Sequence, residues 1–303
     1  MKILFLGASN TDCGHCFTPD NLGDGYVKLT KEQLEASGIP AAAVNGGTDG
    51  FTFPRIYRKW LANWKDASFD AVCILGGINE VGALMDSGRT AAQRDAYLAD
   101  AADALARLLD GILFRSMHIK SSEDSTALPS VQASAGPTAR PFAQSSSSMV
   151  PFAQPPADSS AQSPAQSIGF SVEPSAQSAA DSSTSSSAQA SVQSPAQTSA
   201  TTRSPLVLIL EPFLFDTPAY LRTWMPCLAD IRRAVRETAA RAALRHPGCS
   251  VRVLCTQPAL DEAVRQYGIS AVTTDGIHLA PLGHTCLAKL IVRELSTASS
   301  YIS

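Results

Sequence analysis

A stretch of biased composition divides this chain and limits how much of it can fold. Of the 84 residues from Ser121 to Ser204, 59 are Ser, Ala, Gln or Pro, and the tetrapeptides Pro-Phe-Ala-Gln and Ser-Pro-Ala-Gln each occur twice there. Such a composition buries too little apolar surface to offset the conformational entropy lost on ordering, and the repeats are too short for a solenoid. The sequence therefore predicts a disordered segment over 121–204.

The two flanks, residues 1–120 and 205–303, each lack chemistry that the other holds. The first contains no histidine base in a recognisable motif, and the second contains no nucleophile motif. We therefore predict a single domain built from both flanks, with 121–204 as a surface insertion, rather than two separate domains. Loop-closure entropy permits this, because closing about 84 residues instead of about five costs only roughly 2.5 kcal/mol more.

Strand and helix patterns alternate along both flanks. Short apolar runs predict strands, and apolar residues at helical spacing predict helices between them. Continuous apolar strands separated by helices are typical of a mostly parallel sheet covered on both faces. The predicted fold class is α/β, a three-layer α/β/α sandwich with a mostly parallel five-stranded sheet. The expected strands are 3–6, 42–45, 70–75, 206–210 and 250–255, and the expected helices are 26–36, 56–64, 90–113, 221–245 and 282–295.

Composition narrows the class of partner. The net charge is −3, the pI is about 6.0, and no Lys/Arg cluster is present that would follow a phosphate backbone, so we expect no nucleic acid as a partner.

The apolar run at the N-terminus is too short for a signal peptide, and no other run is long enough for a transmembrane segment. Seven scattered cysteines suit reduced thiols. We expect a soluble cytoplasmic protein.

Polar residues follow three of the predicted strands, where open parallel sheets border their active-site crevice. Ser9 follows the first strand in a Gly-x-Ser turn and could present its hydroxyl and its own N–H. Gly50, after the second strand, and Asn79, after the third, could donate to an oxyanion. Taken singly, each has a simpler interpretation: a helix-capping Ser, a glycine-rich loop and a turn-forming Asn.

Asp275 and His278 lie three residues apart near the C-terminus. This spacing can place the Asp carboxylate against Nδ1–H of the His, which leaves Nε2 to take a proton from a serine hydroxyl. An exposed polar turn is the alternative. His284 competes for the role of base, but its place at the start of a helix favours capping or packing.

Together and in this order, these blocks resemble the SGNH hydrolase family, also called GDSL-type esterases and lipases. The resemblance runs from Lys2 to His284 and skips only the insertion. It implies an SGNH/flavodoxin-like fold. Residues 5–14 are similar to the family's first block, 44–52 to the second, 77–80 to the Gly-x-Asn-Asp block, and 275–278 to the last.

The resemblance implies a mechanism and a set of site residues. Ser9 is the nucleophile, His278 its base and Asp275 the residue that orients the base. Ser9 N–H, Gly50 N–H and the Asn79 amide form the oxyanion hole. The implied activity is hydrolysis of a small-molecule carboxylic ester through an acyl-enzyme, with no cofactor and no metal. We expect a short acyl group, such as acetyl on a carbohydrate, while lysophospholipids and thioesters remain open. The aromatic residues Phe51, Phe53, Trp60 and Trp224 could line an acyl or sugar pocket, but the helical spacing of Trp60 favours a place in the core.

Three residues depart from the family pattern. Ala8 replaces the usual Asp before the serine, Glu80 replaces the usual Asp after the asparagine, and Leu279 stands where a Pro often follows the histidine. The first two changes remove or lengthen carboxylates that are expected to brace the catalytic loops. They motivate an alternative, a weakly active or inactive binding protein on the same fold whose insertion recruits an unknown partner.

The motif Cys13-Gly14-His15-Cys16 resembles the centre of a disulfide oxidoreductase and follows a predicted strand. A redox interpretation leaves the other blocks unexplained, and Cys13 already fits the first esterase block. A coincidental pair of thiols or accidental metal binding is favoured over it. Structural zinc is also disfavoured, because no second Cys/His pair stands at the required spacing.

Overall fold

The computed structural model describes residues 1–85, 88–121 and 204–299. Apart from its two end residues, the predicted disordered insertion 121–204 lies outside the described residues.

One sheet contains strands from both flanks of the chain. Its order is β2 (Ala42–Gly47), β1 (Lys2–Gly7), β3 (Ala71–Leu75), β4 (Leu206–Leu210) and β5 (Ser250–Leu254), and every neighbouring pair is parallel. The two flanks join where β3 pairs with β4, with Cys73 opposite Leu208. The predicted α/β class with a five-stranded parallel sheet is confirmed.

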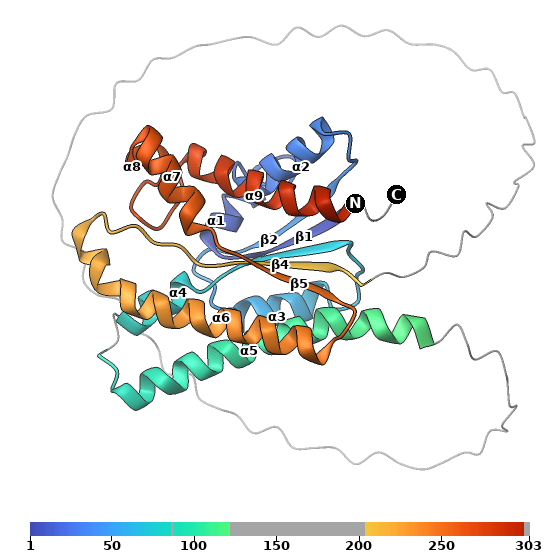
Figure 1. The fold of residues 1–303 in the computed structure, drawn as a ribbon, viewed down its shortest axis with the longest axis horizontal. Coiled ribbons are helices and arrows are strands. Elements are labelled where there is room, and N and C mark those ends of the chain that lie inside the picture. The colour runs from blue at the N-terminus through green and yellow to red at the C-terminus, as the bar shows by residue number, and fades with distance from the viewer. Residues whose placement is uncertain (86–87, 122–203, 300–303) are drawn as a thin grey trace, which may run out of the picture. The chain divides into compact units, whose positions relative to one another are not determined.

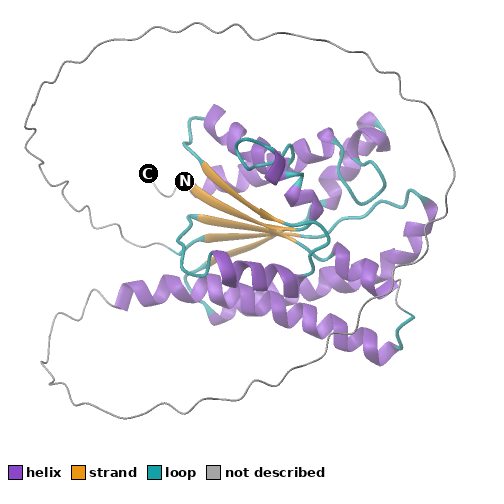
Figure 2. Cartoon of the chain, turned by 180° about the vertical axis from the view of Figure 1, so that it is seen from behind, coloured by secondary structure: helices purple, strands orange, loops and turns teal. Residues whose placement is uncertain are grey.

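Helices cover both faces of this sheet, as Figure 1 shows. One layer contains α1 (Ser9–Asp12), α2 (Tyr26–Ala36), α7 (Gln257–Tyr267), α8 (Ile269–Val272) and α9 (Pro281–Ser299). The other contains α3 (Phe53–Asn63), α4 (Ile78–Met85), α5 (Ala91–Ser121) and α6 (Met225–Arg245). The view from behind in Figure 2 places the strands between the same two helical layers. Short 3₁₀ helices, η1 (His15–Phe17) and η2 (Ala219–Trp224), complete the described elements.

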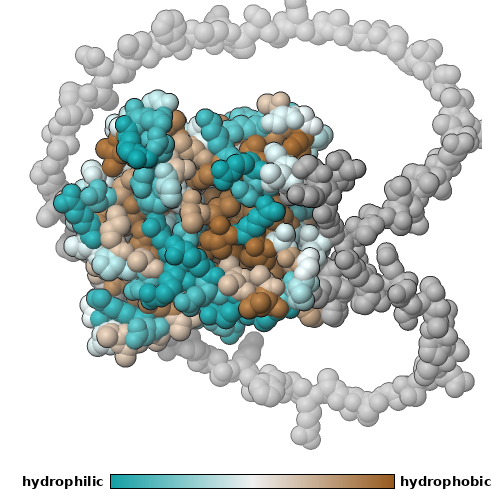
Figure 3. Space-filling model, viewed as in Figure 1, coloured by the Kyte–Doolittle hydropathy of each residue, from teal (hydrophilic) through white to brown (hydrophobic). Residues whose placement is uncertain are grey.

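The strands divide the core into two halves because successive side chains of a strand point to opposite faces. In β1, Leu4 and Leu6 pack in one apolar cluster while Ile3 and Phe5 pack in the other, and all four are fully buried. Trp60 is 5% exposed and belongs to the first cluster, so it is a core residue as its helical spacing predicted. Figure 3 shows apolar surface between the helical layers, framed by hydrophilic surface.

The prediction missed some elements and shifted the ends of others. Helices α4 and α7 were not predicted, and neither were the single turns α1 and α8. Leu221 lies in η2 rather than in the following helix, which begins at Met225 with Pro226 in its first turn. Proline suits that position because the first helical N–H groups have no acceptor within the helix. No helix in the described ranges is long and apolar enough to cross a membrane.

Candidate active site

Ser9 lies directly after β1, at the start of α1. Its N–H is therefore one of the donors that a helix leaves without an intrahelical acceptor. The strand can turn here because Gly7 carries no side chain: an added Cβ would lie 2.1 Å from Thr11 Oγ1 and 2.5 Å from Leu75 O. The close approach of Gly7 to Leu75 places the Ser9 turn against the end of β3.

Asp275 and His278 form a hydrogen-bonded pair in the loop before α9. Asp275 Oδ2 lies 2.6 Å from His278 Nδ1, while Oδ1 accepts the backbone N–H groups of His278 (2.7 Å) and Ile277 (2.9 Å). Burial alone would raise the pKa of Asp275, but these hydrogen bonds outweigh it and the pKa is lowered. The ionised carboxylate holds the imidazole by Nδ1, so Nε2 is left as the ring's proton acceptor.

Asn10 connects the nucleophile turn to the His278 loop. Its Nδ2 donates to Ile277 O at 3.0 Å, and its Oδ1 accepts Leu279 N–H at 2.8 Å, so one side chain holds the backbone on both sides of His278. Asn10 is 7% exposed. Within the described residues no hydrogen bond joins Ser9 and His278 directly. No local pattern in the sequence indicates this role, because the partners of Asn10 lie more than 260 residues away.

The loop that carries Gly50 is tied to the same turn. Thr48 N–H donates to Gly7 O at 3.1 Å, and Asp49 N–H donates to Asp12 Oδ2 at 3.0 Å. Gly50 itself has a φ of +68° and open space where a Cβ would stand. Glycine is therefore favoured here by backbone conformation rather than by crowding.

Buried Asn45 anchors the start of that loop. Its Nδ2 donates to Thr11 O and Leu22 O, each at 2.7 Å, and its Oδ1 accepts Gly47 N–H at 2.9 Å. The amide thereby satisfies backbone groups from two other segments, as a buried polar side chain must.

Asn79 and Glu80, in the first turn of α4, both hold the segment that follows Gly50. Asn79 Nδ2 donates to Phe51 O at 2.9 Å, which uses one of its two amide hydrogens and leaves one for an oxyanion. Glu80 Oε1 accepts Phe53 N–H at 2.5 Å. The family pattern has an Asp at this position. The longer side chain of Glu80 still braces the loop.

The Glu80 carboxyl group is fully buried, and its Oε2 has no hydrogen-bond partner among the described residues. Burial raises its pKa to about 7, although the backbone N–H of Phe53 acts in the opposite direction. Glu80 is therefore a brace that carries little charge below neutral pH.

A small apolar pocket adjoins Ser9 at the carboxyl ends of β1, β3 and β4. Ala8, 5% exposed, contributes a methyl group where the family pattern has a carboxylate. None of the aromatic side chains that the sequence suggested for an acyl pocket lines this one. No side chain in its lining is ionisable as a carboxylic acid or an amine. The lining residues are Ala8, Ser9, Asn10, Leu75, Gly76, Ile78, Pro212 and Phe213.

His284, the competing candidate for the base, packs and hydrogen-bonds against α2. Its Nδ1 accepts Tyr26 N–H at 3.3 Å, and its Nε2 lies 3.5 Å from Cys13 Sγ. Burial lowers the pKa of His284 to about 4, so the ring is neutral near pH 7. It packs against Tyr26 with the rings stacked at 6.3 Å between centroids.

The structure also separates the two thiols of the Cys13-Gly14-His15-Cys16 motif. Cys13 donates to Asn10 O at 3.2 Å, and burial raises its pKa to about 12. A dithiol redox centre needs a thiolate, so Cys13 is poorly suited to one. Across residues 1–85, 88–121 and 204–299, no group of three His, Cys, Asp or Glu side chains is arranged to hold a metal ion.

Comparison with known proteins shows the fold. No family model matches the chain, and no curated protein matches it. The crystal structure of Axe2, an acetylxylan esterase from Geobacillus stearothermophilus, is similar, with a TM-score of 0.52 and 18% identity over 97% of this chain and 93% of that one. LAE5, an alpha/beta hydrolase enzyme from the metagenome of Lake Arreo, Spain, is also similar, with a TM-score of 0.54 and 17% identity over 96% and 93%. At these identities the likeness concerns the fold alone.

Proposed function

We propose that this chain is a serine-dependent carboxylic ester hydrolase. The observation that carries the proposal is the Asp275–His278 pair, held by Asn10 against the turn that bears Ser9. A nucleophile, a base and a residue that orients the base are the arrangement that serine hydrolases require. The likeness of the fold to an acetylxylan esterase supports this class of reaction.

The reaction begins when His278 Nε2 accepts the proton of the Ser9 hydroxyl and Ser9 Oγ attacks the ester carbonyl carbon. The carbonyl oxygen becomes an oxyanion, and Ser9 N–H, Gly50 N–H and the remaining Asn79 amide hydrogen donate to it. The imidazolium, stabilised by the Asp275 carboxylate, then protonates the leaving alkoxide as the C–O bond breaks. Water, activated by His278, hydrolyses the acyl-enzyme and regenerates Ser9.

The pocket beside Ser9 supports short, uncharged acyl groups as substrates. Its walls include Leu75, Ile78 and Phe213, which offer no partner to a charged or strongly polar acyl chain. An acyl chain gains free energy there by leaving water, and the confined space limits its length. We therefore extend the proposal to esters of acetyl to butyryl groups.

Hydrolysis of chromogenic esters from acetyl to octanoyl, together with labelling by a fluorophosphonate probe, tests the proposal. The wild type should hydrolyse the short esters and be labelled, and Ser9→Ala should lose both. Ser37→Ala is the matched control, because the exposed Ser37 hydroxyl donates to Gln33 O at the end of α2 and should be dispensable.

Loss of turnover without loss of labelling in Ser9→Ala would place the reactive serine elsewhere. A folded wild type with neither turnover nor labelling would favour the second candidate, a ligand-binding protein. Two observations support that candidate: Ala8 stands where the family pattern has an Asp, and no direct hydrogen bond joins Ser9 and His278 in the described residues.

A further inference from the structure

A second acid, imidazole and nucleophile lie together over residues 12–16, at the end of α1 and in the segment that follows it. His15 Nδ1 lies 2.8 Å from Asp12 Oδ1, and His15 Nε2 lies 3.5 Å from Cys16 Sγ. This order, with a carboxylate on one ring nitrogen and a thiol on the other, is the pattern by which a base activates a cysteine. The ester chemistry proposed above uses none of these three side chains.

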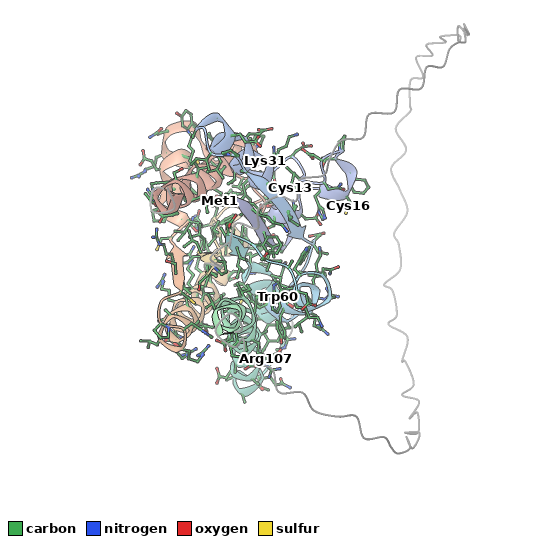
Figure 4. All side chains as sticks on the ribbon, turned by 90° about the vertical axis from the view of Figure 1, so that its right-hand side faces the viewer. Met1, Cys13, Cys16, Lys31, Trp60 and Arg107 are labelled. Carbon is green, nitrogen blue, oxygen red and sulfur yellow. The ribbon has the colours of Figure 1, made fainter. Side chains whose placement is uncertain are left out.

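The two cysteines of this segment differ in accessibility. Cys13 is partly buried and hydrogen-bonded to Asn10 O, whereas Cys16 is exposed. In Figure 4, Cys16 lies at the outer edge of the folded part and Cys13 lies further in. A reagent in solution therefore reaches the thiol that has a base beside it.

Two charged side chains, Asp12 and Lys59, lie beside this segment. Asp12 is ionised: burial would raise its pKa, but the hydrogen bonds from His15 and from Asp49 N–H outweigh this and lower it. Burial lowers the pKa of Lys59, and the negative charge of Asp12 acts in the opposite direction, so the two side chains are close enough to interact. Its Nζ is fixed by hydrogen bonds to Gly47 O at 2.8 Å and Thr48 Oγ1 at 2.6 Å.

We propose that Cys16 is a reactive thiol that forms mixed disulfides with small disulfides from solution, with His15 as its base and Asp12 as the residue that orients that base. The Cys16 Sγ–H proton passes to His15 Nε2, and Sγ attacks one sulfur of the disulfide. The S–S bond breaks, its other half leaves as a thiolate, and the proton on His15 passes to that thiolate or to water. Cys16 is oxidised to the mixed disulfide and the small disulfide is reduced to one thiol.

A metal-binding role is less well supported, because the described residues contain no group of metal-ligating side chains at this place. An internal disulfide with Cys13 is disfavoured by the burial of that thiol. The adduct would lie next to the proposed oxyanion loop, since Asp12 also accepts Asp49 N–H, one residue before Gly50.

The chain provides its own control thiols. Cys255 is also exposed, but partial burial and the negative charge of Glu211 raise its pKa. Cys73 is fully buried in the sheet and reacts only if the protein unfolds. Each rate measured at Cys16 can therefore be compared with an exposed and a buried cysteine in the same molecule.

The experiment uses the full chain and dithiobis-nitrobenzoate, an anionic aromatic disulfide, with each labelled cysteine identified by peptide mass. We expect Cys16 to react at least about tenfold faster than Cys255, in line with the effect of a neighbouring base and cation on thiol reactivity. His15→Gln should lower the Cys16 rate to that of Cys255 and leave the Cys255 rate unchanged. Glutamine can still bond Asp12, so the segment has a means of keeping its shape.

Three results would overturn the proposal. The first is a Cys16 rate no greater than that of Cys255, and the second is a Cys16 rate that His15→Gln leaves unchanged. The third is a Cys13–Cys16 disulfide as the main product. Faster labelling of Cys73 in the variant would reveal unfolding, and His15→Asn would then replace it in the same comparison. Ester turnover plays no part in the readout, so the test is independent of the function proposed for Ser9.

Discussion

The Asp275 and Glu80 carboxyl groups brace opposite sides of the proposed site in different electrostatic environments. The Asp275 side chain is 48% exposed, accepts three hydrogen bonds and has a lowered pKa. Glu80 is fully buried, accepts Phe53 N–H on one oxygen and has a pKa raised to about 7. One group therefore acts through its charge, and the other through its position.

This difference follows from the task on each side. The His278 side must stabilise a positive charge that appears on the imidazole, so an ionised and partly hydrated carboxylate is suited to it. The oxyanion side must stabilise a negative charge, which a nearby ionised carboxylate would oppose. A carboxyl group with a raised pKa holds the loop there with less of that repulsion than an ordinary, fully ionised carboxylate would add.

The largest effect should come from removing the charge on the His278 side. Asp275→Asn keeps the size of the side chain but loses the charge and favours the wrong tautomer of His278. We expect kcat/KM for a short ester to fall by roughly 10³–10⁴-fold, the scale found for this role in serine hydrolases. The control is Asp24→Asn, because Asp24 is exposed and its ion pair with Lys28 lies on the surface.

A fall of less than about tenfold would mean that Asp275 does not act through His278, since general-base catalysis alone is worth more than that. The stability of Asp275→Asn, measured by urea denaturation at neutral pH, checks that the loss lies in catalysis and not in folding.

The next effect concerns the pH dependence of folding on the Glu80 side. The folded-state pKa of about 7 lies above the ordinary glutamate pKa of 4.5, so the folded protein binds more protons between these values than the unfolded chain does. The free energy of unfolding that Glu80 contributes is therefore fully present below about pH 4.5 and is lost as pH rises through 7, by up to about 3 kcal/mol. Tyr97 is the neighbouring titratable group and has a raised pKa, first through burial and then through Glu80.

Glu80→Gln should remove this loss, because glutamine can still accept Phe53 N–H and does not ionise. The urea midpoint of Glu80→Gln minus that of the wild type should be larger at pH 8 than at pH 5. Asp275→Asn is the control at the same two pH values. Because the pKa of Asp275 is lowered, its contribution to the free energy of unfolding is lost only in acid. The urea midpoint of Asp275→Asn should therefore differ from that of the wild type by the same amount at pH 5 and pH 8. Parallel curves for Glu80→Gln and wild type would show that Glu80 stays ionised.

Local patterns predicted the sheet and one side of the site. Runs such as Leu206–Leu210 are apolar throughout because both faces of the strand are buried, and this signal needs no tertiary information. The Asp275–His278 pair was also predictable, since three residues of separation on one loop suffice to bring the side chains together. Helix α4 was missed because it has only eight residues, with Gly82 inside.

The features of the site that could not be predicted from the sequence depend on contacts between distant parts of the chain. The role of Asn10 arises from partners more than 260 residues away, and that of Asn45 arises from backbone carbonyls of two other segments. The raised pKa of Glu80 is a consequence of complete burial, whereas its sequence context suggested an ordinary carboxylate. Chain topology decides which polar residues meet at such a site, and one sequence does not contain that information in a local form.

The smallest effect should appear at Ala8, which lies between the two sides and lines the pocket beside Ser9. Ala8→Val adds two methyl groups to that wall, and the negative φ of Ala8 (−105°) is open to a residue with a larger side chain. We expect kcat/KM for a butyryl ester to fall about tenfold relative to an acetyl ester, the scale of one methylene group in an apolar pocket. Ala92→Val, on the exposed side of α5, is the control and should leave the ratio unchanged. An equal loss for both esters would show that Ala8 supports the Ser9 turn rather than the acyl pocket, and would separate the bracing of the site from its choice of substrate.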